Sequence, residues 1–115
     1  MPDKLEQISQ QRKQAHKRLL ELGSKVYEAF LDMERAAFAD GALTKRDKEL
    51  IAVGISVVRD CESCMEWHIR QAAAAGATMR QVLEAVEVAM EMGGGPATVS
   101  SRFALAVMER AFPNG

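Results

Sequence analysis

The most continuous hydrophobic segment of the chain is residues 50–58, which are apolar on almost every side of a helix. Thr44 stands where a helix N-cap is expected, and Asp47, three residues later, resembles the partner residue of a capping box. Gly54 and Ser56 lie within the segment and would let a neighbouring element approach closely. The pattern therefore predicts a central buried helix that begins after Thr44.

Apolar residues recur at helical spacing in five further segments. These segments are roughly residues 4–22, 24–39, 61–76, 78–92 and 96–112. Ser24, Asp60 and Thr78 are each placed to cap the helix that follows. Gly93-Gly94-Gly95 is expected to end the fifth helix, and Pro96 fits the first turn of the last one. The sequence thus predicts six helices and no strand, which is an all-α fold.

Length and composition predict one domain, residues 1–115, with an N-terminal helical portion (1–35) and a core (36–112). Hydrophobic residues make up 48%, charged residues 27%, and the formal net charge is -1. This balance gives no general attraction to nucleic acid or to an anionic membrane. No apolar run is long enough to span a membrane and the first residues do not resemble a signal peptide, so we expect a cytoplasmic protein.

Two groups of residues are expected to have only a structural role. The basic cluster in the first helix is expected to be a solvent-exposed face, and His16 beside it a surface residue. The cluster consists of Arg12, Lys13, Lys17 and Arg18. Trp67 and the methionines are expected in the core or at a subunit interface.

The candidate chemistry lies in the segment Cys61-Glu62-Ser63-Cys64-Met65-Glu66-Trp67-His68, which contains both cysteines of the chain. On a helix, Cys61, Cys64 and His68 fall within an arc of about 60°. The start of a helix favours a thiolate, and His68 is one turn beyond Cys64, an offset suited to a direct or water-bridged hydrogen bond. In a reducing compartment such a cysteine pair is typical of a redox or metal site and not of a structural disulfide.

Glu49 lies on the predicted central helix, on the same side as Val53 and Ser56. If this helix and the cysteine-bearing helix form a hairpin, the carboxylate comes within reach of His68. Partial desolvation would raise the pKa of Glu49 and prepare it to accept protons through His68. A solvent-facing glutamate near a helix start is the equally simple alternative.

These four residues resemble the Glu…Cys-x-x-Cys-x-x-x-His signature of the carboxymuconolactone decarboxylase and alkylhydroperoxidase D-like family, over roughly Ala36 to Phe112. The resemblance implies an all-α fold, a homo-oligomer (commonly a trimer or hexamer) and thiol-dependent peroxidase activity. It implies that Cys64 is the peroxidatic thiol and Cys61 the resolving thiol. His68 and Glu49 are similar to the family's proton relay.

The same resemblance implies a hydroperoxide substrate and a dithiol reductant, either a thioredoxin-like or a lipoyl-bearing protein. No cofactor is predicted. The apolar surroundings expected from Val53, Met65 and Trp67 suit an organic hydroperoxide. One departure is Ser63, which stands where alkylhydroperoxidase D proteins usually have a second histidine. The family's true decarboxylases lack the cysteine pair, so decarboxylation is not expected.

Three alternatives remain open at the level of the sequence. The cysteines, His68 and a carboxylate could bind zinc, although the soft ligands would all lie on one helix. The cysteine pair could also belong to a general thiol–disulfide oxidoreductase, to a redox sensor without peroxidase turnover, or to a non-enzymatic oligomer in which the pair merely oxidises. Finally, each of these residues could simply pack in the core.

Overall fold

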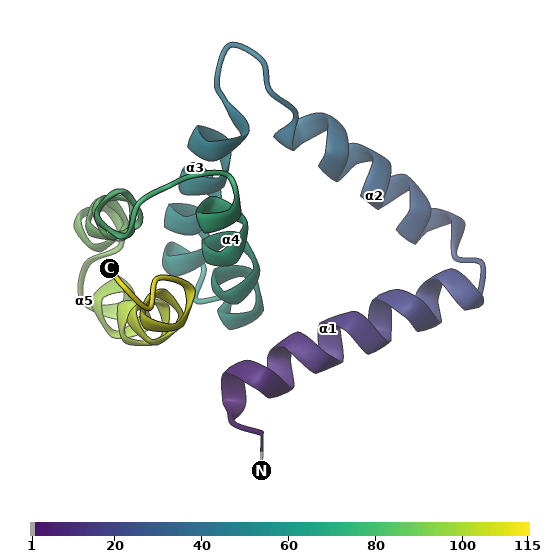
Figure 1. Ribbon diagram of the computed structural model, residues 1–115, viewed down its shortest axis with the longest axis horizontal. Helices are drawn as coiled ribbons and strands as arrows, with labels where there is room; N and C mark the ends of the chain where they lie inside the picture. The colour runs from purple at the N-terminus through teal and green to yellow at the C-terminus, as the bar shows by residue number, and fades with distance from the viewer. Residues whose placement is uncertain (1) are drawn as a thin grey trace.

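The computed structural model describes residues 2–115 and contains only helices in that range (Figure 1). They are α1 (Lys4–Glu21), α2 (Lys25–Phe38), α3 (Lys45–Val58), α4 (Glu62–Ala74) and α5 (Met79–Ala111). The predicted all-α fold is confirmed. None of the helices in residues 2–115 is both long and apolar enough to cross a membrane.

The predicted break at the three glycines is present as a kink at Gly94, and the segments predicted as the fifth and sixth helices are the two halves of α5 on either side of it. Gly94 has φ 69° and ψ -149°, a conformation outside the helical region that glycine adopts without steric cost. Helical structure resumes at once, because Pro96 fits the first turn of a helix and needs no N–H partner there. The two halves of α5 therefore run in different directions around the core (Figure 1).

The core lies where α3, α4 and α5 pack against one another (Figure 1). Its largest fully buried apolar side chains are Val53, Val57, Met65, Ile69, Val82, Val107 and Met108. Gly54 faces α5, and a Cβ atom at this position would lie 3.4 Å from the carbonyl oxygen of Ala85. The glycine of α3 thus permits the close approach that its position in the sequence indicated.

The outer face of α3 differs from the prediction, since the helix is not buried on every side within one chain. Ile51, Ile55 and Val58 are 51%, 55% and 49% exposed. Together with Val88 and Met92 of α5 they line an apolar groove of about 530 Å³. Hydrophobic periodicity identified α3 as unusually apolar, but it could not show that only one of its faces is covered by this chain.

Helices α1 and α2 form an arm that extends away from the core (Figure 1). Asp3 caps α1 by accepting the backbone N–H of Glu6 at 3.0 Å. A hydrogen bond from Arg110 of α5 is the main reason why the pKa of Asp3 is lowered to about 2. Helix α2 has no buried residue. The arm is therefore held mainly through α1.

A buried ion cluster joins α1 to α4. Glu66 is fully buried and pairs with Arg12 of α1 and, at 2.7 Å, with Arg70 of its own helix. The guanidinium of Arg12 also lies 4.7 Å from the centre of the Trp67 ring. The prediction that Arg12 belongs to a solvated basic face was wrong, because sequence periodicity gave no sign of the buried carboxylate that it meets.

We expect the Glu66→Gln substitution to lower the free energy of unfolding by about 2 kcal/mol. Removing one partner of a buried ion pair typically costs about 3–5 kcal/mol. The cost is smaller here because the side chains of Arg12 and Arg70 are 28% and 40% exposed and can be hydrated. Urea unfolding monitored by circular dichroism would measure the loss.

The matched control is Glu62→Gln on the same helix. Glu62 pairs with Lys4 at 2.7 Å, but the pair is exposed to solvent, so this substitution should cost about 0.5 kcal/mol or less. Equal effects of the two substitutions would contradict a special contribution from the buried cluster.

Candidate functional site

The two cysteines lie at the start of α4 and are joined by a disulfide bond, with their Cα atoms 5.2 Å apart. Cys61 is the N-cap of α4, and its sulfur accepts the backbone N–H of Cys64 at 3.2 Å. The prediction that Asp60 is the cap was wrong, because Asp60 instead belongs to the turn that ends α3. The positive end of the α4 dipole therefore acts directly on the sulfur of Cys61 and favours a thiolate there once the disulfide is reduced.

Glu49 and His68 meet where α3 and α4 pack together. Glu49 is 2% exposed, and one of its carboxylate oxygens lies 2.7 Å from Nδ1 of His68. The ring of Phe38 stacks on the imidazole, with the ring centres 5.3 Å apart. A carboxylate can only accept a hydrogen bond, so Nδ1 carries the proton and Nε2 of the neutral ring keeps a free lone pair.

Lys45 completes the carboxylate's environment. Its Nζ atom lies 2.6 Å from the second oxygen of Glu49 and 3.3 Å from the side-chain oxygen of Gln71. Burial acts to raise the pKa of Glu49, but hydrogen bonds from His68 and Lys45 outweigh it, so this pKa is lowered. The prediction of a raised pKa was wrong because it considered desolvation without the cation one helical turn away. Glu49 therefore remains ionised and orients His68.

The lowered pKa of Glu49 predicts a specific acid sensitivity of the fold. A carboxylate whose pKa is lower in the folded than in the unfolded state stabilises the protein above the unfolded value, near 4.5, and loses that contribution as the pH falls through the folded value. The stability advantage of the wild type over Glu49→Gln should therefore be largest near neutral pH and shrink in acid. Urea unfolding from about pH 7 to about pH 3 measures it. An advantage that grows in acid would contradict the assignment.

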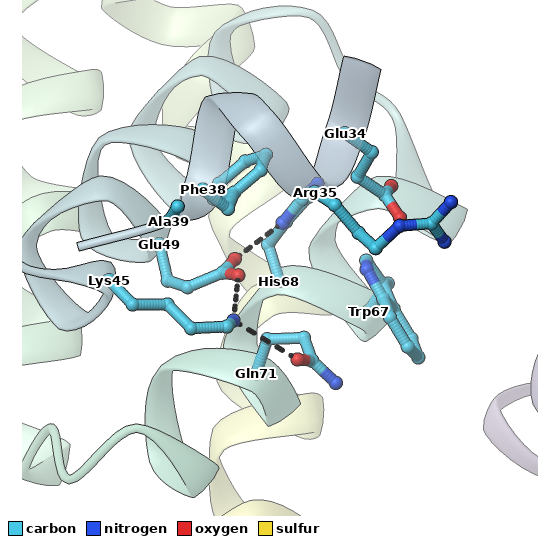
Figure 2. Close-up of a pocket in the computed structure, with 9 residues that line it drawn as sticks. All are labelled: Glu34, Arg35, Phe38, Ala39, Lys45, Glu49, Trp67, His68 and Gln71. Atoms are coloured by element: carbon cyan, nitrogen blue, oxygen red, sulfur yellow. Dashed lines mark hydrogen bonds and ion pairs between the residues drawn. The ribbon is translucent and has the colours of Figure 1, made fainter. Parts of the chain in front are cut away.

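A cavity of about 290 Å³ opens beside this cluster, and its floor and walls come from α2, α3 and α4 (Figure 2). Its lining residues are Glu34, Arg35, Phe38, Ala39, Lys45, Glu49, Trp67, His68 and Gln71. In Figure 2 the hydrogen bonds run from His68 to Glu49 and on through Lys45 to Gln71, while Trp67 and Arg35 lie on the other side of the opening. The cavity combines aromatic surface with ionised groups.

The structure brings the four predicted residues together as two pairs. Cys61 is bonded to Cys64, and Glu49 is hydrogen-bonded to His68. Helix α4 connects the pairs, because it carries both Cys64 and, one turn later, His68. Within residues 2–115 no hydrogen bond joins the imidazole to either sulfur, and neither cysteine is among the residues that line the cavity.

The interpretation of the sequence did not identify Lys45 and Phe38 as site residues. Trp67 was expected in the core or at an interface and also, with Val53 and Met65, around the substrate. Of these three, Trp67 lines the cavity, while Val53 and Met65 are fully buried in the core. Lys45 had a usable signal, because it lies four residues before Glu49 and a lysine and glutamate at this spacing are neighbours on a helix. Phe38 gave no such signal, because it is the last residue of α2 and its distance from His68 depends on the conformation of the loop between α2 and α3. Trp67 is half-buried and forms part of the cavity wall.

Comparison with known proteins relates the chain to one family. The sequence profile described as "Carboxymuconolactone decarboxylase family" matches residues 24–108. An uncharacterised protein of the cox locus of Paracoccus denitrificans is 45% identical over 87 residues, covering 76% of this chain and 78% of its own length. An uncharacterised protein of Cupriavidus necator is 40% identical over 81 residues, covering 70% and 72%.

The fold is similar to that of solved structures. A carboxymuconolactone decarboxylase family protein from Legionella pneumophila is 30% identical, with a TM-score of 0.89 over 96% of this chain and 98% of its own. A protein from Thermotoga maritima is 24% identical, with a TM-score of 0.82 over 90% and 91%. The profile match, the sequence relatives and the shared fold together show that this chain belongs to the carboxymuconolactone decarboxylase family.

Proposed function

We propose that this protein is a thiol-dependent peroxidase that reduces hydroperoxides through the Cys61–Cys64 dithiol and its disulfide. The observation that carries the proposal is the buried hydrogen bond of 2.7 Å between Glu49 and His68, together with the position of His68 on α4, one turn after Cys64 of the cysteine pair. An ionised carboxylate that fixes the tautomer of a histidine is a recurrent way to prepare a general base. A nearby thiol is the group that such a base can activate.

In the first half-reaction, Nε2 of His68 takes the proton from Cys64, directly or through one water molecule. The thiolate attacks the O–O bond of the hydroperoxide, so one oxygen goes to sulfur as a sulfenic acid and the other leaves as the alcohol with the proton that His68 returns. Glu49 stays ionised throughout, which agrees with its lowered pKa, and stabilises the imidazolium that forms in between.

In the second half-reaction, the thiolate of Cys61 attacks the sulfenic acid of Cys64 and forms the disulfide. The departing hydroxide takes up the proton that the Cys61 thiol gave up on ionisation, so the net product is water. The backbone N–H of Cys64 at 3.2 Å from the sulfur of Cys61 supports this role, because it stabilises negative charge there. A thioredoxin-like or lipoyl-bearing dithiol then attacks Cys61, and the resulting exchange returns both cysteines to thiols while the reductant becomes a disulfide.

We infer that the substrate is an organic hydroperoxide. The rings of Phe38 and Trp67 provide apolar surface in the cavity beside His68, and Arg35 and Lys45 provide positive charge. Ser63 is exposed in the position of the additional family histidine, so the proton relay ends at His68. A small apolar molecule with a polar or acidic end fits this environment better than hydrogen peroxide alone.

A homo-oligomer, a trimer or hexamer, is part of the proposal. Three large apolar side chains of α2, namely Val26, Phe30 and Met33, are 83%, 49% and 60% exposed. The apolar groove between α3 and α5 is a second such surface on the same chain. Exposed apolar area of this extent is typical of surfaces that associate.

The proposed activity is tested by steady-state consumption of cumene hydroperoxide with dihydrolipoamide, thioredoxin or dithiothreitol as the dithiol. The proposal expects many equivalents of peroxide to be consumed per protein chain with at least one of these donors. A redox sensor would consume about one equivalent and stop, and that result with every donor would overturn the proposed function.

The zinc alternative receives no support from the geometry. Across residues 2–115 no three His, Cys, Asp or Glu side chains are grouped so that they could hold a metal ion. Metal analysis of protein purified without chelator is the direct check, and a stoichiometric amount of zinc would favour that alternative over the redox proposal.

A further inference from the structure

The turn between α3 and α4 contains an unusual backbone conformation directly before the cysteine pair. Asp60 has φ 52°, and it is the one non-glycine residue with positive φ in residues 2–115. Its N–H bonds to Val57 O at 3.1 Å, and the N–H of Cys61 bonds to Ser56 O at 3.0 Å. This pair of hydrogen bonds is the Schellman helix ending, in which the left-handed position is usually glycine because a Cβ atom is unfavourable there.

The aspartate side chain has a partner that glycine could not provide. Ser100 Oγ donates a hydrogen bond to Oδ1 of Asp60 at 2.7 Å. Ser100 lies on α5 beyond the kink at Gly94 and is 8% exposed, so the turn is tied to an element 40 residues away in the sequence. Asp60 thus adopts an unfavourable backbone conformation, and its side chain makes a tertiary hydrogen bond that glycine could not make.

Cys61 is held by hydrogen bonds to both helices, through its backbone N–H to α3 and through its sulfur to α4. Its N–H completes the ending of α3, and its sulfur caps α4 through the N–H of Cys64. Little freedom remains between the two, because Cys61 is the single residue that separates Asp60 from the first residue of α4, Glu62. A shift of the Asp60 turn would therefore move the Cys61 sulfur away from the N-terminus of α4.

We propose that Asp60 and Ser100 are a positioning pair that holds the Cys61 sulfur on the backbone N–H of Cys64, in the first turn of α4, and thereby makes the disulfide easier to reduce. Stabilising a thiolate in the reduced form shifts the dithiol–disulfide equilibrium towards the dithiol. The Ser100 hydrogen bond also engages one oxygen of the Asp60 carboxylate, whose negative charge next to a thiolate would act in the opposite direction. Of the other charged neighbours, Glu62 pairs with Lys4 at 2.7 Å and Arg59 is exposed.

The inference deepens the proposed function and rests on it only in that the pair must cycle between dithiol and disulfide. Its test measures the equilibrium constant for reduction of the disulfide by dithiothreitol and the rate at which iodoacetamide alkylates Cys61 in the reduced protein. Neither measurement needs peroxide, so an absence of peroxidase turnover and a failure of this inference are separate results.

We expect Ser100→Ala to lower both quantities about threefold to tenfold. Asp60→Gly keeps the left-handed turn and removes the acceptor, so it should give a similar decrease. Asp60→Asn keeps an acceptor and tolerates the left-handed region, so it should stay within about twofold of the wild type. The matched control is Ser101→Ala, because Ser101 is also buried and its hydroxyl donates to Ala97 O of its own helix, at 2.7 Å.

Two results would overturn the inference. One is an unchanged equilibrium constant and alkylation rate in both Ser100→Ala and Asp60→Gly while the proteins remain folded by circular dichroism. The other is an increase of both quantities in Asp60→Gly and Asp60→Asn with no change in Ser100→Ala, because the charge of Asp60 and not its hydrogen bond would then control the pair. The first of these results includes the case in which the substitutions change only the thermal stability, as Ser101→Ala does.

Discussion

Cys64→Ser is expected to lower peroxide turnover by about 10³-fold or more, to the level of the uncatalysed reaction with the dithiol. The hydroxyl of serine has nearly the shape of the thiol but is neither ionised at neutral pH nor nucleophilic towards peroxide oxygen. Cys64 is half-buried in the first turn of α4, so the substitution should leave the fold intact. The measurement is the initial rate of cumene hydroperoxide consumption at saturating dithiol.

The matched variant Cys61→Ser separates the two thiols. It retains the proposed nucleophile but cannot form the disulfide, so it should consume about one equivalent of peroxide rapidly and accumulate a sulfenic acid that dimedone traps at residue 64. Turnover that survives Cys64→Ser but is lost in Cys61→Ser would reverse the assignment. The Cys61 sulfur at the N-cap of α4 would then be the nucleophile.

His68→Gln is the substitution with the second largest expected effect. Removal of a general base typically costs about 10²- to 10⁴-fold in rate, and glutamine retains a donor that can reach Glu49 without supplying a base. The surface histidine His16, which contacts the hydroxyl of Tyr27 at 2.6 Å, offers the control His16→Gln. We expect that control to have the wild-type rate.

Glu49→Gln tests whether the carboxylate acts through His68. Without its negative charge the imidazolium is no longer stabilised and the tautomer is no longer fixed, so the rate should fall by less than in His68→Gln. The double substitution should be no slower than His68→Gln alone, because the two residues act as one unit. Independent, multiplying losses would show that Glu49 has a role that does not pass through the imidazole.

Much of the local structure could be predicted from the sequence because it depends on local chemistry. Ser24, Thr44 and Thr78 cap their helices as their residue types indicate, and Thr78 with Gln81 forms a full capping box. Cys64 and His68 lie one turn apart on α4, as their spacing indicates, but Cys61 is the N-cap with an extended backbone and is not itself a helical residue. Hairpin packing of α3 on α4 was sufficient to bring Glu49 to His68.

The errors concern features that depend on which groups meet across the fold. The lowered pKa of Glu49 requires knowing that Lys45 turns inward, and the burial of Glu66 requires knowing where α1 lies. Cys61 replaces Asp60 as the cap because the Schellman ending of α3 and the start of α4 share one residue. Such competition between two helix ends is a tertiary property, which residue preferences for single positions do not encode.

A single turnover of the reduced protein with one equivalent of cumene hydroperoxide and no external dithiol tests the proposed peroxidase reaction of Cys61 and Cys64 most directly. Mass spectrometry of the peptides and quantification of the alcohol are done on the same sample. We expect one equivalent of alcohol and a protein mass lower by two hydrogen atoms, with the peptides showing a disulfide bond between Cys61 and Cys64. Unreacted peroxide with both thiols still free, or alcohol formed without that disulfide, would contradict it.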